Sequence, residues 1–452
     1  MNVNLSNSED RINTALVLVC FIGLVAYYVG IINMYVWLFF LLIRLFTFNR
    51  KEFGFFALLF GSSMFGRMFA SQSLYLSTIV LFLVLGIIAL RNEIFSVLSK
   101  SFHSYFFLLI LIGFFLVEYL LGPGTFYAHD KIMKLSVRGL IWLTVFLIFV
   151  QSDEISNKKI AVSFLLLTLF YLSQSAQLYG IRPSAVLDFS YFRDYCDMIG
   201  RNEAYTEVVN YQTLGYLALA PSIFCMMDSD WSKNNAVMTY AIIAISFWVL
   251  LLSGTRQTLV IFLAIAFLRY ILGQKGPIPY TRLIGLAIAA VLVYFMISNL
   301  GSSSYDQMIN EDGDLSYSIN RDTTTPFAVM DINPFFGVGF GGYVLYAHKA
   351  YPHNFFLEVI DELGIVGLLF ILAVLTCFMM TNVNKVYFRF LSRNGSYIFL
   401  FFLMCFLRSM ISGDMADSMS FICVLLAMTL LPEPAQDEVT ELAVIEDNGH
   451  SV

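Results

Sequence analysis

The sequence predicts an all-α, polytopic membrane protein with about fourteen transmembrane helices, within a range of 12–14, and two large loops on one side of the membrane. Three observations predict this class. Hydrophobic residues make up 59% of the 452 residues and charged residues only 13%, whereas soluble domains carry about 25% charged residues. Apolar runs long enough to cross about 30 Å of hydrocarbon recur along the chain. Lys and Arg gather in alternate short loops, which is the asymmetry that orients membrane proteins.

Taken in order, the chain contains fourteen apolar runs that are separated mostly by short polar connections. The first two runs are nearly continuous, which is typical of a tight hairpin or of a partly re-entrant pair. We expect no cleavable signal peptide, because an acidic segment precedes the first run and no small-residue cleavage site follows it. The predicted spans are 13–29, 31–47, 53–70, 74–90, 104–121, 136–151, 160–179, 209–227, 237–253, 257–273, 283–299, 364–380, 395–411 and 418–431.

The distribution of basic residues predicts that both termini are cytoplasmic. With the N-terminus inside, the inner loops hold 13 Lys and Arg and the outer loops hold seven, as expected of short cytoplasmic loops. The two large loops, about 180–208 and 301–353, then lie on the outer side. Residues 1–431 form one integral membrane domain, and the acidic tail 432–452 is expected to be disordered and cytoplasmic.

Composition also excludes several classes of protein. The net charge is −6, and the chain has no basic domain or nucleic-acid module, so no nucleic-acid partner is expected. Five of the six cysteines lie in apolar segments and none forms a C-x-x-C pair, so neither a disulfide framework nor a thiolate metal site is predicted. No Asp, Glu or His spacing is typical of metal ligands, and we therefore expect neither a metal nor a cofactor.

Four arginines lie near the outer ends of predicted spans, namely Arg67, Arg138, Arg256 and Arg408. An arginine at the centre of a transmembrane helix costs about 2.5–3.5 kcal/mol, and less near the interface. One interpretation is that each side chain extends independently to the outer headgroups. The other is a cationic pocket for phosphate or pyrophosphate, because a guanidinium can hold a phosphate through two parallel hydrogen bonds.

Arg256 is the strongest of these four candidates because it follows a polar break between two apolar runs. The break, Leu252–Thr258, contains Gly254, which permits a sharp turn before the next helix. A helix N-terminus with free N–H groups and a nearby arginine is a suitable anion site. The alternative is an ordinary tight turn that carries a surface arginine.

The large outer loop ends in a glycine-rich motif, Asp331–Tyr343. Its four glycines resemble a nucleotide-binding loop by eye, but no βαβ context surrounds them and they lie outside the cytoplasm. A close-packed turn is the better prediction. The glycines are Gly337, Gly339, Gly341 and Gly342.

An amphipathic helix along the membrane surface is predicted over 354–363, with Asn354 as its N-cap. Glu358, Asp361 and Glu362 form its polar face. His353 then stands at the start of this helix, beside the membrane surface. A lone histidine in this position is either incidental or part of an active site.

Two segments resemble the motifs of the O-antigen polymerase/ligase family. One is Asn333-Pro-Phe-Phe-Gly-Val-Gly-Phe-Gly, followed by His353-Asn354-x-x-Leu357 and Glu362-x-Gly364-x-x-Gly367, and the other is Ser253-Gly-Thr-Arg256. The resemblance implies a metal-independent glycosyltransferase of the GT-C type in the bacterial inner membrane, with its active site on the periplasmic face. Its substrates would be oligosaccharide repeats linked to undecaprenyl pyrophosphate.

The resemblance also implies roles for individual residues. Arg256 would bind pyrophosphate, and His353 would contact the donor phosphate or deprotonate the acceptor hydroxyl. Asn354, Arg67, Arg138 and Arg408 are further candidates for substrate binding, and the family's additional periplasmic arginine would be Arg321, Arg193 or Arg182. The expected partners are the lipid-linked repeats and the lipid bilayer, with a chain-length regulator as one more candidate.

We favour a polymerase of surface-polysaccharide, or O-antigen, biosynthesis, which transfers a glycan chain onto the next lipid-linked repeat. The rival within the family is an O-antigen ligase, which transfers the chain to lipid A-core. A rival from another class is a flippase or transporter of lipid-linked oligosaccharides, which would place charges near the bilayer midplane in both halves. The predicted arginines lie at outer helix ends and the long loops lie on one side, which favours chemistry at the membrane surface.

Overall fold

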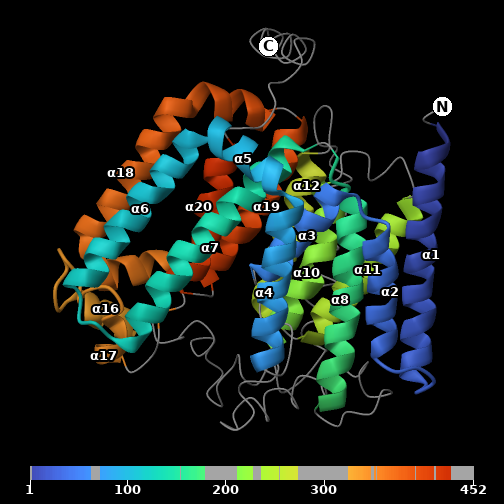
Figure 1. The fold of residues 1–452 in the computed structure, drawn as a ribbon. Coiled ribbons are helices and arrows are strands. Elements are labelled where there is room, and N and C mark those ends of the chain that lie inside the picture. The colour runs from blue at the N-terminus through green and yellow to red at the C-terminus, as the bar shows by residue number, and fades with distance from the viewer. Residues whose placement is uncertain are drawn as a thin grey trace, which may run out of the picture. The chain divides into compact units, whose positions relative to one another are not determined.

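The computed structural model describes residues 3–62, 72–152, 154–178, 211–227, 236–253, 255–272, 324–347, 351–352, 354–391, 393–411 and 414–428. These residues are all-helical and contain no strand, as the composition predicts. The chain divides into two compact units (Figure 1), each made from two separate stretches. Unit 1 comprises Met1–Leu90 and Glu154–Thr324, and unit 2 comprises Arg91–Asp153 and Thr325–Val452.

Unit 1 is organised around helix α8. In the 18-residue window that makes its apolar stretch Asn157–Gln177 a candidate span, 94% of the residues are buried, because α1, α2, α10 and α11 all pack against this helix. The rings of Phe164 and Phe224, from α8 and α10, stack with centroids 5.7 Å apart. The described helices of this unit are α1 (Val3–Tyr28), α2 (Tyr35–Phe46), α3 (Arg50–Gly61), α4 (Gln72–Ala89), α8 (Asn157–Leu178), α10 (Tyr211–Met227), α11 (Ala236–Ser253) and α12 (Arg256–Leu272).

A capping box begins α3 and also joins it to α8. The Asn49 side chain accepts a hydrogen bond from the Glu52 N–H, and the Glu52 carboxylate accepts one from the Asn49 N–H. The same carboxylate pairs with the Lys159 ammonium at 3.0 Å. A buried carboxylate is tolerated when it is paired and hydrogen-bonded in this way.

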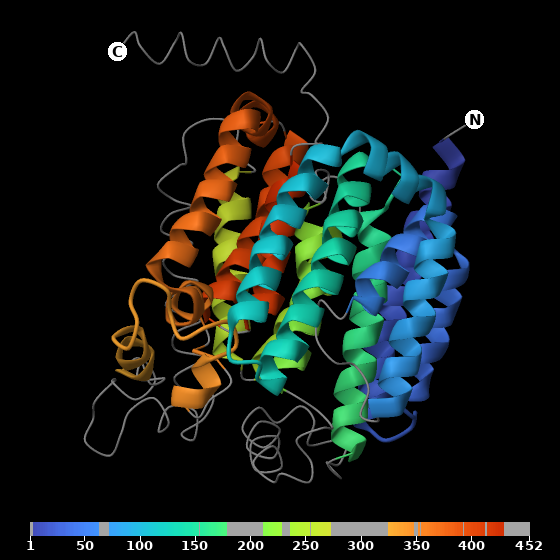
Figure 2. The ribbon, with the colours of Figure 1, turned by 60° about the vertical axis from the view of Figure 1, so that its left-hand side comes forward.

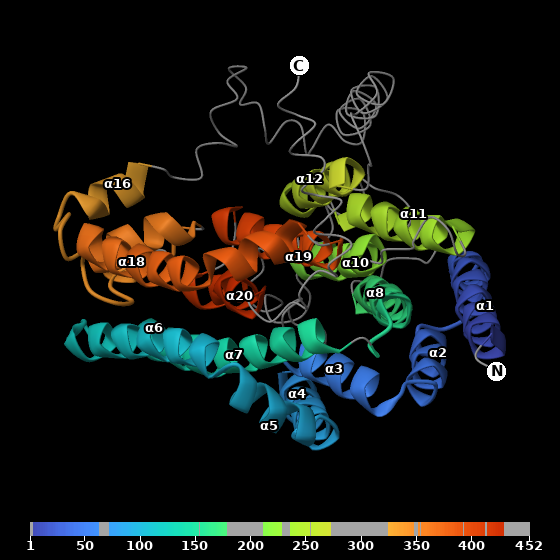
Figure 3. The same cartoon turned by 90° about the horizontal axis from the view of Figure 1, so that it is seen from above.

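Unit 2 consists of two layers of helices (Figure 3). Helices α6 and α7 run side by side in one layer (Figure 2), and α18, α19 and α20 form the other. Helix α20 packs closely on α7, which joins the layers. The described helices are α5 (Arg91–Lys100), α6 (Phe102–Leu121), α7 (Phe126–Gln151), α16 (Thr324–Met330), α17 (Tyr343–Ala347), α18 (Phe355–Leu391), α19 (Arg393–Ile411) and α20 (Met415–Ala427).

Helix α18 is two helices that meet at Gly364. This residue has φ of 67° and ψ of −175°, a left-handed backbone conformation that glycine adopts without a steric penalty. The break separates a short first segment, 355–363, from a long second segment, 365–391. The second segment is strongly apolar, whereas the first carries three carboxylates.

The chain is a multi-pass membrane protein. Five described helices are long and apolar enough to cross a bilayer, or six if Leu76–Ala89 and Arg91–Lys100 together make one broken span. Six further apolar helices of the described part are shorter, with 10–17 residues. The predicted span 283–299, the loop 180–208 and the first part of the loop 301–353 lie outside the described residues, so fourteen spans remains a prediction.

The predicted start of a span at residue 136 is wrong. Helix α7 begins at Phe126 and not at residue 136, because the Thr125 hydroxyl caps it by accepting a hydrogen bond from the Ala128 N–H at 3.0 Å. Arg138 was expected near the outer end of a span, but it lies at the midpoint of α7. The sequence also assigned Lys131 to an outer loop, whereas it is a buried helical residue.

Candidate functional site

The structure describes part of the predicted site. The side chains of Arg138, Arg408 and Asn354 are described and all belong to unit 2, while Arg256 is described by its backbone only, in unit 1. Five predicted site residues lie outside the described residues: Arg67, Arg182, Arg193, Arg321 and His353.

Asn354 is the N-cap of α18, as the sequence predicts. Its side-chain oxygen accepts hydrogen bonds from the N–H groups of Phe356 at 3.0 Å and of Leu357 at 3.1 Å. Its amide nitrogen donates to the Met410 carbonyl at 3.0 Å. The Asn354 side chain therefore caps the N-terminus of α18 and also links it to the last turn of α19 by a hydrogen bond.

Two of the predicted arginines converge on a carboxylate that sequence reasoning missed. Arg138 Nη1 lies 2.5 Å from Asp417 Oδ1, and Arg408 Nη2 lies 3.7 Å from Asp417 Oδ2. The exposed fractions of the three side chains are 25%, 12% and 29%, so solvent reaches the cluster. Two guanidinium groups thus face one carboxylate, and guanidinium groups are suited to binding an anion.

Asp417 is held in place by the capping of α20. The Asp414 side chain accepts a hydrogen bond from the Asp417 N–H at 2.8 Å, and the Asp414 carbonyl accepts one from the Ser418 hydroxyl. Burial raises the pKa of the Asp414 carboxyl, and the neighbouring Asp417 charge raises it further. The raised pKa favours the neutral form of the Asp414 carboxyl. Asp414 therefore neutralises less of the positive charge of Arg138 and Arg408 than an ionised carboxylate would.

The described residues on either side of His353 lie next to this cluster. Asn354 contacts Met410, two residues after Arg408. Burial, followed by the charges of Asp414 and Asp417, raises the pKa of Tyr351 to about 12. The Tyr351 phenol is therefore neutral at physiological pH, and its ring stacks on Tyr127 of α7 with centroids 6.4 Å apart.

A second, fully buried ionic cluster lies in the same unit, where Lys131 of α7 pairs with both Glu358 and Glu362 of α18. All three side chains have an exposed fraction of 0%. Glu362 Oε2 lies 2.6 Å from Lys131 Nζ and also accepts the Gly341 N–H at 2.9 Å. Lys131 Nζ is 5.0 Å from the centroid of the Phe340 ring, which adds a cation–π contact.

This cluster corrects the predicted amphipathic helix. Glu358, Asp361 and Glu362 were expected to form a polar face at the membrane surface, but they are buried. The reason is tertiary: α7 supplies an ammonium, and a buried carboxylate needs such a partner. The sequence does hold a weak signal, because Glu358 and Glu362 are four residues apart and share one helix face.

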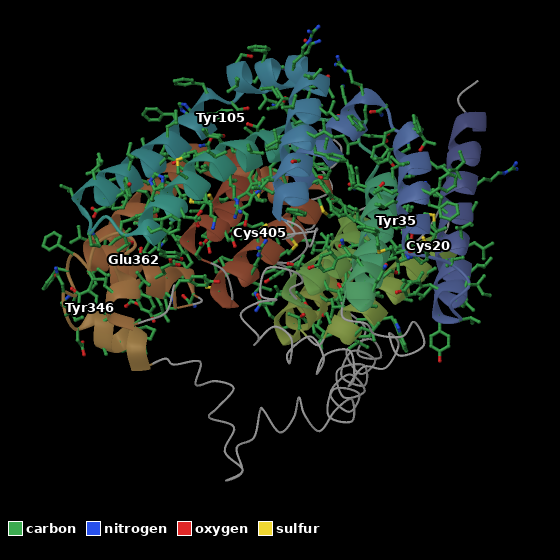
Figure 4. The ribbon with its side chains drawn as sticks, turned by 60° about the horizontal axis from the view of Figure 1, so that its bottom comes forward. Cys20, Tyr35, Tyr105, Tyr346, Glu362 and Cys405 are labelled. Carbon is green, nitrogen blue, oxygen red and sulfur yellow. The ribbon has the colours of Figure 1, made fainter. Side chains whose placement is uncertain are left out.

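The glycine-rich motif is a close-packed turn, as predicted, and it wraps the break in α18. Val338 N–H and Gly339 N–H donate to the carbonyls of Asp361 and Glu362, both at 2.9 Å. A Cβ added at Gly337 would lie 2.3 Å from the Glu362 carbonyl carbon, so no larger residue fits there. Figure 4 labels Glu362, which lies among the helices of the unit.

In unit 1, the polar break before Arg256 is a buried turn. The Ser253 hydroxyl donates to the Leu250 carbonyl at 2.7 Å and shares a hydrogen bond with the Thr255 hydroxyl at 2.8 Å. A Cβ added at Gly215 of α10 would lie 2.7 Å from the Thr255 hydroxyl. Helix α12 begins at Arg256. The first N–H groups of this helix therefore come directly after a tightly packed turn.

Gln257 adds a donor at the start of α12. Its side chain is 8% exposed, and its Nε2 has no hydrogen-bond partner within the described part of the chain. A buried amide without a partner is unfavourable, so a bound acceptor would stabilise this position. Among the described residues, no group of three or more His, Cys, Asp or Glu could hold a metal ion.

Comparison of the sequence with models of known protein families finds a match to one family. Residues 241–372 match the sequence model of a family described as O-antigen ligase. The match includes both motif segments, Ser253–Arg256 and His353–Gly367, and it confirms the resemblance to the O-antigen polymerase/ligase family over this part of the chain. No curated protein matches the chain significantly.

Proposed function

We propose that this protein is a polysaccharide polymerase, a membrane glycosyltransferase that moves a glycan chain from undecaprenyl pyrophosphate onto the next lipid-linked repeat. The observation that carries the proposal is the family match over 241–372, which spans both motifs. Members of the matched family are membrane glycosyltransferase-like enzymes, and the multi-pass helices of this chain agree with such an activity.

The proposed reaction balances without a cofactor. The acceptor hydroxyl oxygen attacks the anomeric carbon of the donor sugar and forms the new glycosidic bond. The bond between that carbon and the phosphate oxygen breaks, and undecaprenyl pyrophosphate leaves with the electron pair. The hydroxyl proton passes to a base. Stabilising the leaving pyrophosphate is therefore the main electrostatic task, and arginines and helix N-termini can fulfil it.

The residues divide between these tasks. Arg256, at the start of α12, is proposed to bind pyrophosphate, helped by the free amide of Gln257. Arg138 and Arg408 are proposed as a further anion-binding pair, because both guanidinium groups converge at Asp417 and solvent reaches them. His353 is proposed either to contact the donor phosphate or to accept the hydroxyl proton, for which an imidazole with pKa near about 6.5 is suited.

The reaction is proposed to take place on the periplasmic side of the inner membrane, with both termini cytoplasmic. The basis is the excess of Lys and Arg in the predicted inner loops. Single cysteines at Gly313 and Ile181 should react with an impermeant reagent in intact cells, and cysteines at Arg282, Lys385 and Asn448 should not. Labelling at 313 only after the inner membrane is opened would reverse the orientation.

A ligase is the second candidate, because the matched family carries the description O-antigen ligase. The two activities share their donor and differ in the acceptor. A polymerase uses a second lipid-linked repeat, and a ligase uses lipid A-core. The predicted number of spans, about fourteen, favours the polymerase.

Purified protein in proteoliposomes separates these activities. With lipid-linked repeats as the only substrate and excess chelator, we expect a ladder of longer lipid-linked glycans. Transfer to added lipid A-core without a ladder would identify a ligase instead. The absence of both products, with the donor intact, would refute glycosyl transfer, and activity that returns only with a divalent ion would refute the metal-independent mechanism.

A further inference from the structure

An uncharged segment of unit 2, Ile332–Ala347, carries exposed apolar side chains. It contains no Asp, Glu, Lys, Arg or His over its whole length. Phe335 and Phe336 are 63% and 67% exposed, and Leu345 and Tyr346 are 53% and 50% exposed. Several large apolar side chains that are exposed within one short segment are typical of an interaction surface.

The segment lies beside the ends of two candidate membrane spans. Gly122 directly follows α6, and a Cβ placed on it would lie 3.1 Å from the Phe340 carbonyl oxygen. The N–H of Val366, in the first turn after the break in α18, donates to the Phe335 carbonyl at 3.1 Å. Figure 1 shows α17 at the same end of unit 2 as the end of α6.

The exposed apolar surface of these spans continues into the segment. At the end of α6, Leu120 and Leu121 are 71% and 78% exposed, and Ile365 and Val366 of α18 are 42% and 45% exposed. These four residues belong to candidate spans, and exposed apolar side chains on such a span are suited to contact with lipid. Because the Val366 N–H is hydrogen-bonded to the Phe335 carbonyl, Phe335 lies at the same level as Val366.

Much of the backbone of this segment is hydrogen-bonded within the protein. A non-helical backbone is unfavourable at membrane depth unless its polar groups are satisfied within the protein. The Phe336 N–H donates to the Asn333 side chain, and other amides of the turn donate to carbonyls or to Glu362. The amides that donate in this way include those of Ile332, Phe336, Gly337, Val338, Gly339, Gly341, Gly342 and Leu345.

We propose that Ile332–Ala347 is a membrane-inserted loop, with the Phe335 and Phe336 side chains in the acyl-chain region of the leaflet that surrounds the carboxyl end of α6. The partner of this surface is bilayer lipid. The hydrogen bonds between this loop and the break in α18 would hold the two rings at a fixed depth. Tyr346 and Glu362 are both labelled in Figure 4, and Tyr346 is exposed whereas Glu362 is buried. This inference does not depend on the proposed glycosyl transfer.

Lipid-quenched fluorescence of the full chain in proteoliposomes tests the insertion. Phe336→Trp keeps an aromatic ring at a 67% exposed position, and the emission of the unchanged protein is subtracted. The control is Glu154→Trp, because the Glu154 side chain is 63% exposed in a charged turn beside Lys51. Lipids carry bromine either near the ester end or near the methyl end of the acyl chains.

We expect the added emission at position 336 to lose most of its intensity with bromine near the ester end, and less with bromine near the methyl end. Aqueous iodide should leave it unchanged. The added emission at position 154 should show the opposite response, with quenching by iodide and little by lipid. Iodide quenching at position 336 would place the loop in water and overturn the proposal. A lack of quenching by either reagent would show that protein covers the ring, and it would overturn the proposal as well.

Discussion

Arg138 and Asp417, which are far apart in the sequence, form an ion pair between Nη1 and Oδ1 at 2.5 Å. Asp417 also faces Arg408, so one carboxylate orients two guanidinium groups at the start of α20. In one interpretation, Asp417 orients both arginine side chains so that they can bind an anion. In the other, the ion pair has only a structural role and joins α7 to α20. These two interpretations predict different outcomes when the carboxylate is removed.

If the arginine pair binds an anionic substrate, Arg138→Ala should weaken donor binding by about 10- to 100-fold, since hydrogen bonds to charged groups contribute about 1.5–3 kcal/mol. Asp417→Asn removes the competing charge, so donor binding should be kept or strengthened. The measurement is the dependence of polymerisation on donor concentration in proteoliposomes. Equal losses in the two variants, with lower amounts of folded protein, would favour a purely structural pair.

Lys131→Met should strongly destabilise the protein, because it leaves Glu358 and Glu362 buried without a counter-charge. Removing one partner of a buried ion pair costs about 3–5 kcal/mol. The double variant Lys131→Met/Glu358→Gln should recover part of the loss, and thermal unfolding in detergent measures both. The control is Lys134→Met on the same helix, where the pair with Asp130 is partly exposed. If Lys134→Met is equally harmful, the stabilisation does not come from the buried cluster.

Gly364→Ala should distort the break in α18. An L-residue in the left-handed region costs roughly 1–2 kcal/mol, and the added Cβ would lie 2.2 Å from the Phe335 carbonyl oxygen. We therefore expect a lower unfolding temperature and reduced activity. Gly113→Ala in α6 is the matched control, since a Cβ there has no neighbour within 4 Å and should be neutral or slightly stabilising. An unchanged Gly364→Ala variant would mean that the break is not required.

Arg256→Lys should severely reduce polymerisation at a normal protein level. The substitution keeps the charge but loses the planar group that donates two parallel hydrogen bonds to phosphate. Arg91→Lys, at an exposed position of α5, should be close to the unchanged protein. The measurement is glycan chain length together with the amount of protein in the membrane. Nearly full activity of Arg256→Ala would remove this residue from the site.

His353→Ala should abolish or greatly reduce chain growth without lowering the amount of protein in the membrane. General acid–base groups contribute about 10²–10⁴-fold to a rate, so the assay must detect residual activity at low expression. His348→Ala, five residues earlier in the same loop, should be much milder. If both variants behave alike, or if His353→Ala only lowers protein abundance, His353 has a structural role.

The sequence by itself determined the class of the protein. Apolar runs such as 104–121 and 160–179 correspond to α6 and α8, because burial in lipid or in a helical core needs long uninterrupted apolar stretches whatever their partners are. Local signals also located the Asn354 cap and the close-packed glycine turn. The cap depends on groups within a few residues, and the glycines by themselves permit a tight backbone, so the sequence pattern is sufficient to predict both. The residues of α18 against which the turn packs come only from the tertiary structure.

Only the tertiary structure decided the state of the charged residues. Glu358 and Glu362 look like a solvated helix face in the sequence, yet Lys131 from α7 allows them to be fully buried. Arg138 looks like an independent interfacial arginine, yet Asp417 of α20 pairs with it. The physical reason is that a charge in an apolar environment is governed by its nearest counter-charge, and these counter-charges come from helices that are remote in the sequence.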